Sequence, residues 1–516
     1  MNAMIVDWLL SFAPILFILI LMVRFRWGAA KAGAAGWLAT VAIAATWFGV
    51  GIDMLALTQT KALLLTLDVL LIVWAAFLLY RVADEAGAIK TLGTALPHLT
   101  ADRGMQALLI GWSFASFLQG VGGFGVPVAV TAPLLVGLGF SPMLAVIAPS
   151  IGHSWSVTFG SLASSFQALM AASGMPGTAL GPPSALVLGL AGLGCGFMVV
   201  HVVDGWAGVR RLALPVIVLA AAMGVTQYWL VANTLWNIGG FGAGMAGLLV
   251  GFVLARWYRG DRSADNGKLD ARAVALAFSA YLALIVITLL IVFVTPLSDF
   301  LGQIVIQTRF PKMQTALGYI TAAERGRKIV LLTHAGAVLT YASVVAYLIY
   351  RWAGLYSPGA AGRIVSGTVK QVMSSSLGIA SMVGMATVMS HAGMTDVLAR
   401  GLAQSVGALF PLASPWVGAL GAFMTGSNTN SNVVFTALQK RTAELLGYNA
   451  PLILAAQTAG GAIGSVVAPT KIVVGASTAG LAGKEGPVLR GLLPYAGILI
   501  AGVSVAAWIL IGVLPR

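Results

Sequence analysis

The sequence contains little charge: Asp, Glu, Lys and Arg make up 9% of its 516 residues, against 59% hydrophobic residues. Soluble domains carry about a quarter charged residues, so this composition excludes a soluble protein of this length. Apolar runs close to the ~20 residues that a helical membrane span needs recur along the chain. With interrupted segments included, this length rule predicts an all-α, polytopic membrane protein of roughly 12–14 membrane segments.

Cysteine is almost absent. The single cysteine, Cys195, lies in an apolar segment and cannot form an intrachain disulfide, so we expect it to be a small core residue. The sequence has no His-Glu-x-x-His zinc motif, no Gly-x-Ser-x-Gly elbow and no Cys/His cluster. These absences argue against an intramembrane enzyme, and we expect neither a cofactor nor a metal site.

Acidic residues are outnumbered, because 29 Lys and Arg against 15 Asp and Glu give a net charge of +14. The basic residues are dispersed over loops, which favours contact with the lipid bilayer and no binding of nucleic acid. Arg24 and Arg26 follow the first apolar run, and residues 256–272 form the clearest other basic loop. By the positive-inside rule these loops are cytoplasmic and the N-terminus lies outside. A cleaved signal peptide is not expected, because the N-terminus lacks a basic region and carries Asp7.

A polar tract, Gly426-Ser-Asn-Thr-Asn-Ser-Asn432, stands between strongly apolar segments. In hydrocarbon, broken backbone persists only where protein or a water-filled cavity surrounds it, so the tract predicts a membrane helix interrupted to line a site. Hydroxyl and amide groups, together with the positive end of a half-helix, can replace the water around an anion. The predicted substrate-binding residues of the tract are Ser427, Asn428, Thr429, Asn430, Ser431 and Asn432.

A related glycine-rich tract, Phe117-Leu-Gln-Gly-Val-Gly-Gly-Phe-Gly-Val-Pro127, lies in the first half of the chain. Phe423-Met-Thr precedes the polar tract, so both tracts open on Phe-x-x-Gly, and a second interruption follows each, at residues 149–161 and 458–471. Paired interruptions in corresponding halves are the best sequence sign of a transporter binding site. They predict two repeats, and the sequence leaves open whether these are parallel or inverted.

The interruptions divide the chain into three parts. The first half, residues 1–295, holds the first interrupted region at about 105–172. Residues 296–328 form a more polar connector, which we expect to include an interfacial helix. The second half, residues 329–516, holds the second interrupted region at about 412–484.

Three glycines of the first tract, Gly122, Gly123 and Gly125, are predicted to let the backbone approach the substrate closely. The alternative is that they only allow tight helix packing.

Four further residues are candidates for the transport chemistry. Thr470 and Lys471 are predicted to bind the substrate. They lie in an apolar stretch, where a lysine costs on the order of 2.5–3.5 kcal/mol, and an anionic substrate would offset that cost. The alternative is that Lys471 extends to the interface. Asp68, in the middle of an apolar run, and His153, within the first interruption, are candidates for a proton relay. A structural pairing remains the alternative for Asp68.

The two tracts, together with Gly460-Gly-Ala-Ile-Gly464, closely resemble the bacterial lactate permease family. The resemblance implies a symporter that imports lactate or glycolate with protons across the bacterial cytoplasmic (inner) membrane. It also implies inverted repeats with re-entrant hairpins, which favours the inverted arrangement. A proton is thus the expected coupling ion, with sodium, a passive anion channel and a homodimer left open.

Three positions depart from the family pattern, which often has Glu at Gln119, Asp at Asn428 and a neutral residue at Lys471. All three changes shift the expected site toward positive charge. They raise the alternative of a more highly charged substrate, such as a dicarboxylate or a sulfonated acid. Coupling matters in either case, because an anion entering a negative interior works against ~2.3 kcal/mol per charge per 100 mV.

Overall fold

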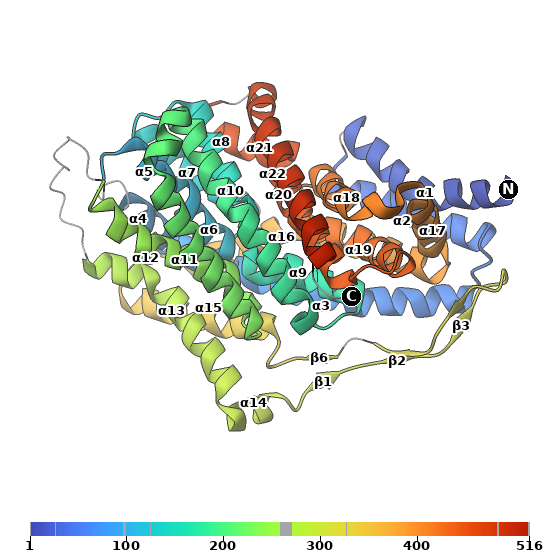
Figure 1. The fold of residues 1–516 in the computed structure, drawn as a ribbon. Coiled ribbons are helices and arrows are strands. Elements are labelled where there is room, and N and C mark those ends of the chain that lie inside the picture. Colours follow the sequence, from blue (N-terminus) through green and yellow to red (C-terminus); the bar gives the residue numbers. More distant parts are fainter. Residues whose placement is uncertain are drawn as a thin grey trace.

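The computed structural model describes residues 2–25, 27–95, 100–123, 125–258, 271–326, 328–481 and 484–513. These parts of the chain are helical except for one narrow β-ribbon and the connecting turns (Figure 1). The helices before the ribbon are α1 (Asn2–Val23), α2 (Ala29–Thr46), α3 (Ile52–Glu85), α4 (Ala88–Ala95), α5 (Arg103–Gln106), the π-helix η2 (Ala107–Phe114), α6 (Ala115–Val121), α7 (Val126–Gly137), α8 (Pro142–Gly152), the 3-10 helix η3 (Ser154–Ser156), α9 (Gly160–Ser173), α10 (Gly177–Arg211), α11 (Ala213–Ala232), the 3-10 helix η4 (Trp236–Ile238), α12 (Gly239–Ala255), α13 (Ala271–Phe293) and α14 (Thr295–Leu301).

The second half repeats this helical character. Its helices are α15 (Ala335–Trp352), α16 (Ala360–His391), α17 (Met394–Val406), the 3-10 helix η5 (Gly407–Leu409), α18 (Phe410–Thr425), α19 (Asn428–Leu445), α20 (Ala450–Val466), α21 (Pro469–Thr478) and α22 (Glu485–Val513). The ribbon between the halves consists of β1 (Val305–Ile306), β2 (Arg309–Phe310), β3 (Met313–Gln314), β4 (Ile320–Thr321), β5 (Glu324–Arg325) and β6 (Ile329–Val330).

The expected all-α, polytopic membrane fold is confirmed. Within the described residues, ten helices are long and apolar enough to cross a membrane, or eleven if α20 and α21 are one bent span. The expected 12–14 segments also counted the half-helices of the interrupted regions, several of which are too short to be counted by this length criterion. The apolar run at residues 329–350 is not one continuous helix, because its first residues pair in the ribbon and α15 begins only after the N-cap residue His334.

The two halves follow the same order of elements. Each has a long, partly buried helix (α3 or α16), a short helix (α4 or α17) and a hairpin of half-helices (η2/α6–α7 or α18–α19). An interrupted helix (α8–η3–α9 or α20–α21) and a long closing helix (α10 or α22) follow. This shared order is the one that a two-repeat organisation would produce, and the repeats stay a prediction.

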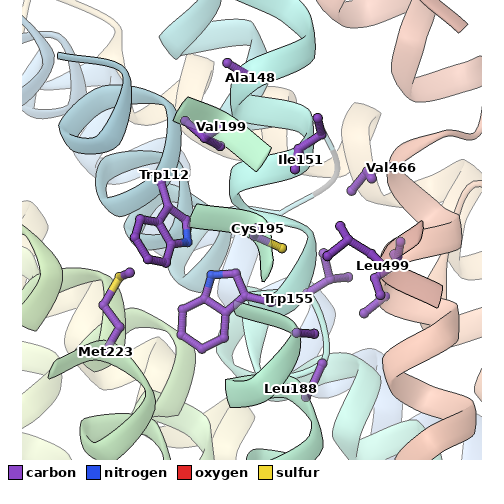
Figure 2. Close-up of a cluster of buried hydrophobic side chains, with 14 of the residues drawn as sticks. Trp112, Ala148, Ile151, Trp155, Leu188, Cys195, Val199, Met223, Val466 and Leu499 are labelled. Atoms are coloured by element: carbon purple, nitrogen blue, oxygen red, sulfur yellow. The ribbon is translucent and has the colours of Figure 1, made fainter. Parts of the chain in front are cut away.

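A buried aromatic cluster fixes the interruption in the first half (Figure 2). Trp112 of η2, Trp155 of η3 and Cys195 of α10 have exposures of 0%, 1% and 0%. Gly192 and Gly196 of α10 make room for the indoles, because a Cβ there would lie 2.9 Å from the ring of Trp155 and 2.5 Å from that of Trp112. Cys195 is thus the buried core residue that was expected, and η3 is held by packing on both sides.

The polar connector contains a helix, α14, as expected, and also a ribbon that was not predicted. Among its described residues only α14 is helical, and the ribbon strands pair antiparallel as β1–β6, β2–β5 and β3–β4. Figure 1 shows the yellow ribbon running along one edge of the bundle, from α14 toward the end where α1 and α17 lie. It is anchored there, because the Ala316 amide donates to the Gly49 carbonyl at 2.8 Å and Lys61 of α3 forms an ion pair with Glu324.

Candidate functional site

A small polar pocket lies where the tip of the second hairpin meets the interrupted helix of the first half. Its free volume of about 20 Å³ is room for about one water molecule. The lining residues are Gln119, Val157, Ser161, Ser164, Ser165, Gly426, Ser427, Asn428, Thr429 and Lys471. Four residues predicted from the sequence, Ser427, Asn428, Thr429 and Lys471, therefore come together here, in a state too closed to hold an organic acid.

Lys471 is the one charged residue among those lining the pocket. The chain bends by 43° between α20 and α21, and Lys471 lies in the first turn of α21. Its Nζ donates to the Ser465 hydroxyl at 3.0 Å, and none of the lining residues is acidic. The ammonium group can therefore accept an anion without first breaking an ion pair to the pocket wall.

The polar tip is shaped by local chain geometry. Gly426 ends α18 with φ +70°, in the left-handed region that favours glycine. Ser427 then caps α19, its hydroxyl accepting from the Asn430 amide at 3.3 Å. The Thr470 hydroxyl lies close by, since a Cβ on Gly426 would be only 2.5 Å from it. The positive end of α19 consequently lies at the pocket, where it favours negative charge.

Asn428 joins the two halves of the chain. Its amide donates to the hydroxyls of Thr158 and Thr458 at 3.1 and 3.3 Å. The same two threonine hydroxyls lie 3.1 Å apart. Asn428 is 2% exposed, so these bonds form in a medium where an unpaired donor would be costly.

The remaining residues of the tract face protein. Asn432 donates to the Ser165 carbonyl and to the Thr458 hydroxyl, each at 2.9 Å. Ser431 donates to the Gly418 carbonyl of α18 at 2.7 Å. Asn430 lies on the side of α19 that faces α1 and α16. In the structure none of these three residues lines the pocket, and the bonds of Ser431 and Asn432 hold the hairpin in place.

The three glycines of the first tract also contact protein. A Cβ on Gly122 would lie 3.0 Å from the Tyr80 ring, and one on Gly123 only 1.9 Å from the Ser161 hydroxyl. Gly123 and Gly125 have φ of +55° and +93°. None of the three lines the pocket. The absence of side chains at Gly122 and Gly123 lets the first hairpin approach α3 and α9, whereas Gly125 lies near Val474 of α21.

Asp68 and His153 lie outside the pocket lining. Asp68 is buried in α3 and its carboxylate is 3.0 Å from Nε2 of His334. Nδ1 of His334 accepts from the Gly336 amide at 3.2 Å, so Nε2 carries the proton that is donated to Asp68. His153 donates from Nδ1 to the Pro149 carbonyl at 2.5 Å, and its buried Nε2 has no hydrogen-bond partner in the described part of the chain.

The interrupted helix of the first half contains a strained turn. Ser161, Leu162 and Ala163 have φ of 46°, 54° and 67°, although none is glycine. Left-handed backbone costs about 1–2 kcal/mol for each such residue. Strain of this kind gathers at functional sites, and Ser161 is a pocket residue.

Several pocket residues were not predicted as site residues. Gln119 lines the pocket, and its buried Oε1 has no hydrogen-bond partner among the described residues. The hydroxyl of Ser165 lies 3.0 Å from that of Thr429. Gln119 already stood out as a departure from the family pattern, whereas Ser165 sits in an ordinary Ser-Ser pair that carries no signal of its own.

Comparisons with known proteins agree on one family. A family profile described as L-lactate permease matches residues 7–514. The L-lactate permease of Salmonella typhimurium strain LT2 is 27% identical over 84% of this chain and 83% of its own length. Glycolate permease GlcA of Escherichia coli K12 is 25% identical over 96% of this chain and 94% of its own. These relatives are permeases rather than enzymes.

Two solved transporters resemble the fold. MtrF of Neisseria gonorrhoeae, described as one of a class of antimetabolite efflux pumps, has a TM-score of 0.52 at 13% identity, over 96% of this chain and 97% of its own. The YdaH transporter of Alcanivorax borkumensis has a TM-score of 0.49 at 17% identity, over 90% of each chain. The likeness to MtrF concerns the fold alone.

Proposed function

Because the chain belongs to the L-lactate permease family, we propose that it imports a small 2-hydroxy monocarboxylate, namely L-lactate, D-lactate or glycolate, by proton symport. The protein is a multi-pass bacterial membrane protein, and we place it in the inner membrane with its N-terminus outside. The observation that carries the proposal is the small polar pocket described above, called the central pocket from here on, which is lined by one lysine, several hydroxyls and no acid.

The pocket offers a partner for each polar group of such a substrate. The carboxylate binds Lys471 and the hydroxyls of Ser427 and Thr429 at the positive end of α19. The 2-hydroxyl donates to Oε1 of Gln119, a buried acceptor that otherwise has no partner in the described structure. A hydrogen bond to a charged group contributes about 1.5–3 kcal/mol, so Lys471 supplies most of the affinity and Gln119 the selectivity.

Transport requires the pocket to open by alternating access, because its present volume of about 20 Å³ excludes the substrate. The two halves are bonded to each other at the pocket by Thr158 to Thr458, Ser165 to Thr429 and Asn432 to Ser165. Rocking one half against the other would break these buried bonds. We therefore infer that α9 and α19 move together against α3 and α16, and that the bond between Ser165 and Thr429 opens to admit the substrate.

The coupling proton needs a carrier outside the pocket, since no lining residue is a carboxylate. The carriers we propose are the buried pair of Asp68 and His334, and His153. One proton cancels the charge of one monocarboxylate and so removes the cost of ~2.3 kcal/mol per 100 mV.

A second candidate is a carrier of a more highly charged acid, a dicarboxylate or a sulfonated acid. The observation in its favour is that Gln119 and Asn428 are neutral while Lys471 is a cation, all in one pocket. A dianion would need more than one proton or sodium ion for the same cancellation.

The experiment is uptake of radiolabelled L-lactate into proteoliposomes, with pH and sodium gradients imposed separately, together with counterflow. The proposal predicts saturable uptake driven by the pH gradient and lost in Lys471→Met. In Gln119→Leu, discrimination between lactate and propionate, which lacks the hydroxyl, is expected to fall. The control is Lys484→Gln, which removes an exposed charge away from the pocket.

The other outcomes separate the alternatives. Uptake driven only by sodium identifies sodium coupling. Flux that follows voltage without counterflow identifies a passive channel. No lactate uptake, together with uptake of a dicarboxylate or sulfonated acid, overturns the proposal in favour of the second candidate.

A further inference from the structure

A much larger cavity, of about 570 Å³, lies between the ribbon and the helix bundle. We call it the vestibule. Its walls come from the ribbon, from α3, α16 and α17, and from the neighbouring ends of α9 and α19. The ionisable residues that line it are Lys61, Tyr319, Glu324, Arg325, His391, Asp396, Lys440, Arg441 and Glu444.

Most charges of the vestibule are already paired. Arg441 lies 2.5 Å from Asp396 and 3.5 Å from Glu444. Lys61 forms an ion pair with Glu324, which also lies 3.9 Å from His391. These pairs hold the ribbon and α17 against the bundle and leave little net charge among themselves.

Two cations can still act on a ligand, one without an ion pair among the described residues and one in a long ion pair. Arg325, on strand β5, is exposed and forms no ion pair with the described residues. Lys440, on α19, donates to the Ser173 carbonyl at 2.8 Å and lies 4.0 Å from Glu444. An ammonium group has three donors, so Lys440 can still donate to a ligand. Its bond to the Ser173 carbonyl fixes the orientation of the group. The two cations belong to different walls, one on the ribbon and one on the bundle.

The vestibule leads toward the central pocket. Val433 and Ala168 line the vestibule, whereas Thr429 and Ser165, one helical turn away on the same helices, line the pocket. The bonded hydroxyls of Thr429 and Ser165, 3.0 Å apart, therefore lie between the two spaces. A ligand held in the vestibule therefore lies about one helical turn from the central pocket.

The vestibule also opens on the side from which import begins. Pro176, the N-cap of α10, lines it, while Arg210 and Arg211 stand at the opposite end of α10. Adjacent arginines at a span end favour the cytoplasm. The vestibule accordingly faces the outside.

We propose that the vestibule is an outer binding site for small organic carboxylates, in which Lys440 and Arg325 hold the anion before the central pocket opens. Only the identity of the anion rests on the proposed function. Both cations are partly exposed, so the outer site binds weakly, releases readily and is screened by salt. The ribbon then has a part in transport, because it supplies one wall and one cation of the site.

The first test measures the charge selectivity of the vestibule without any substrate. Thr395 lines the vestibule, and the only native cysteine, Cys195, is buried, so Thr395→Cys supplies a single reactive thiol. The ratio of its labelling rates by an anionic and a cationic methanethiosulfonate is measured in the otherwise native chain. Replacing Lys440 or Arg325 by Gln is expected to lower this ratio roughly two- to fivefold.

The matched control is Lys312→Gln, which removes a charge from the same ribbon at a residue that does not line the vestibule. It is expected to leave the ratio unchanged. Equal ratios in all four backgrounds, or a fall in the Lys312 control as large as in the others, would overturn the outer site whatever the protein transports.

The second test uses transport. Lys440→Gln is expected to raise the apparent KM for L-lactate roughly two- to fivefold while Vmax stays the same, and the difference should shrink at high salt. A loss of Vmax with KM unchanged would contradict the outer site and indicate a structural role for Lys440.

L-lactate should also slow labelling of Thr395→Cys. Charge-selective labelling that lactate fails to slow supports the anion site and refutes lactate as its ligand, so the two proposals fail separately.

Discussion

The two hairpin tips occupy the same place in the two halves, yet they contribute differently. At the first tip, Gly122 and Gly123 lie against the side chains of Tyr80 and Ser161. At the second tip, Ser427 and Thr429 line the pocket. One tip provides close packing and the other provides polar contacts. Corresponding positions in a repeated fold therefore need not have corresponding chemistry.

The two interrupted helices differ in a similar way. The second-half helix bends by 43° at a proline, whose ring removes a backbone donor and needs no unusual φ. The first-half helix breaks through η3 and three left-handed residues that are not glycine. The proline bend costs little free energy, whereas the left-handed turn stores backbone strain beside the pocket.

The largest effect is expected from Lys471, which faces the polar tip. Lys471→Met removes a hydrogen bond between a charged group and the substrate, worth about 1.5–3 kcal/mol, so uptake efficiency should fall roughly 10- to 150-fold. Thermal unfolding in detergent should change little, because the partner of Lys471 is a single hydroxyl. Proteoliposome uptake and a melting curve measure the two quantities, and a large loss of stability would assign Lys471 a structural role instead.

A substitution that disturbs the close packing of the first hairpin tip should lower the stability of the protein. In Gly123→Ala the added methyl meets the Ser161 hydroxyl at 1.9 Å, on backbone with φ +55°. Overpacking of this kind costs about 1–3 kcal/mol, and the left-handed φ adds to it. The midpoint of thermal unfolding should fall accordingly.

A double variant separates the two causes of that loss. Adding Ser161→Ala removes the hydroxyl that clashes, so part of the stability should return while the cost of the φ angle remains. If the double variant is no more stable than Gly123→Ala alone, the contact with Ser161 is not the cause.

At the polar tip of the second hairpin, a substitution can weaken substrate binding while leaving stability nearly unchanged. Ser427→Gly keeps a residue that caps helices nearly as well, so stability should change by only a few tenths of a kcal/mol. The substrate's carboxylate loses one hydroxyl donor, worth about 1.5 kcal/mol at the low end for a bond to a charged group, and its KM should rise roughly tenfold. Uptake measured over a range of lactate concentrations checks this, and an unchanged KM would remove Ser427 from the site.

The smallest effect concerns the strained turn. Ala163→Gly relieves left-handed strain of about 1–2 kcal/mol against an entropy cost of about 0.5–1 kcal/mol, so a net gain of about 0–1.5 kcal/mol is expected. Ala172→Gly, in the regular part of α9, should instead lose about 1 kcal/mol. Melting curves of both variants decide the matter, since equal losses would show that residue 163 is not strained.

The fold was largely predictable, because a membrane span must satisfy its backbone hydrogen bonds within a single helix. Such a helix can be recognised in the sequence by its length and its apolar residues. The polar tract likewise pointed to the pocket, since Ser427, Asn428 and Thr429 line it. Which residues of the tract turn away could not be predicted. That depends on where α19 begins and on which face meets α18, as the bond from Ser431 to Gly418 illustrates.

Other parts left no pattern to recognise. Ser165 meets Thr429 across 264 positions of sequence, and a single sequence holds no record of such a pair. The ribbon is built from strands of two residues, too short for an alternation of polar and apolar side chains to be seen. Asp68 was recognisable as an unusual buried acid, but its pairing with His334 follows only from the fold.

The turn at the end of the ribbon provides a practical handle on the molecule. Gly318 has φ +88° and open space around it, and its neighbour Leu317 is 67% exposed. A short epitope inserted between these two residues would extend away from the bundle without displacing a helix. Exposed turns of this kind tolerate insertions well. An antibody against that epitope, applied to intact cells, would report which face of the membrane the ribbon occupies.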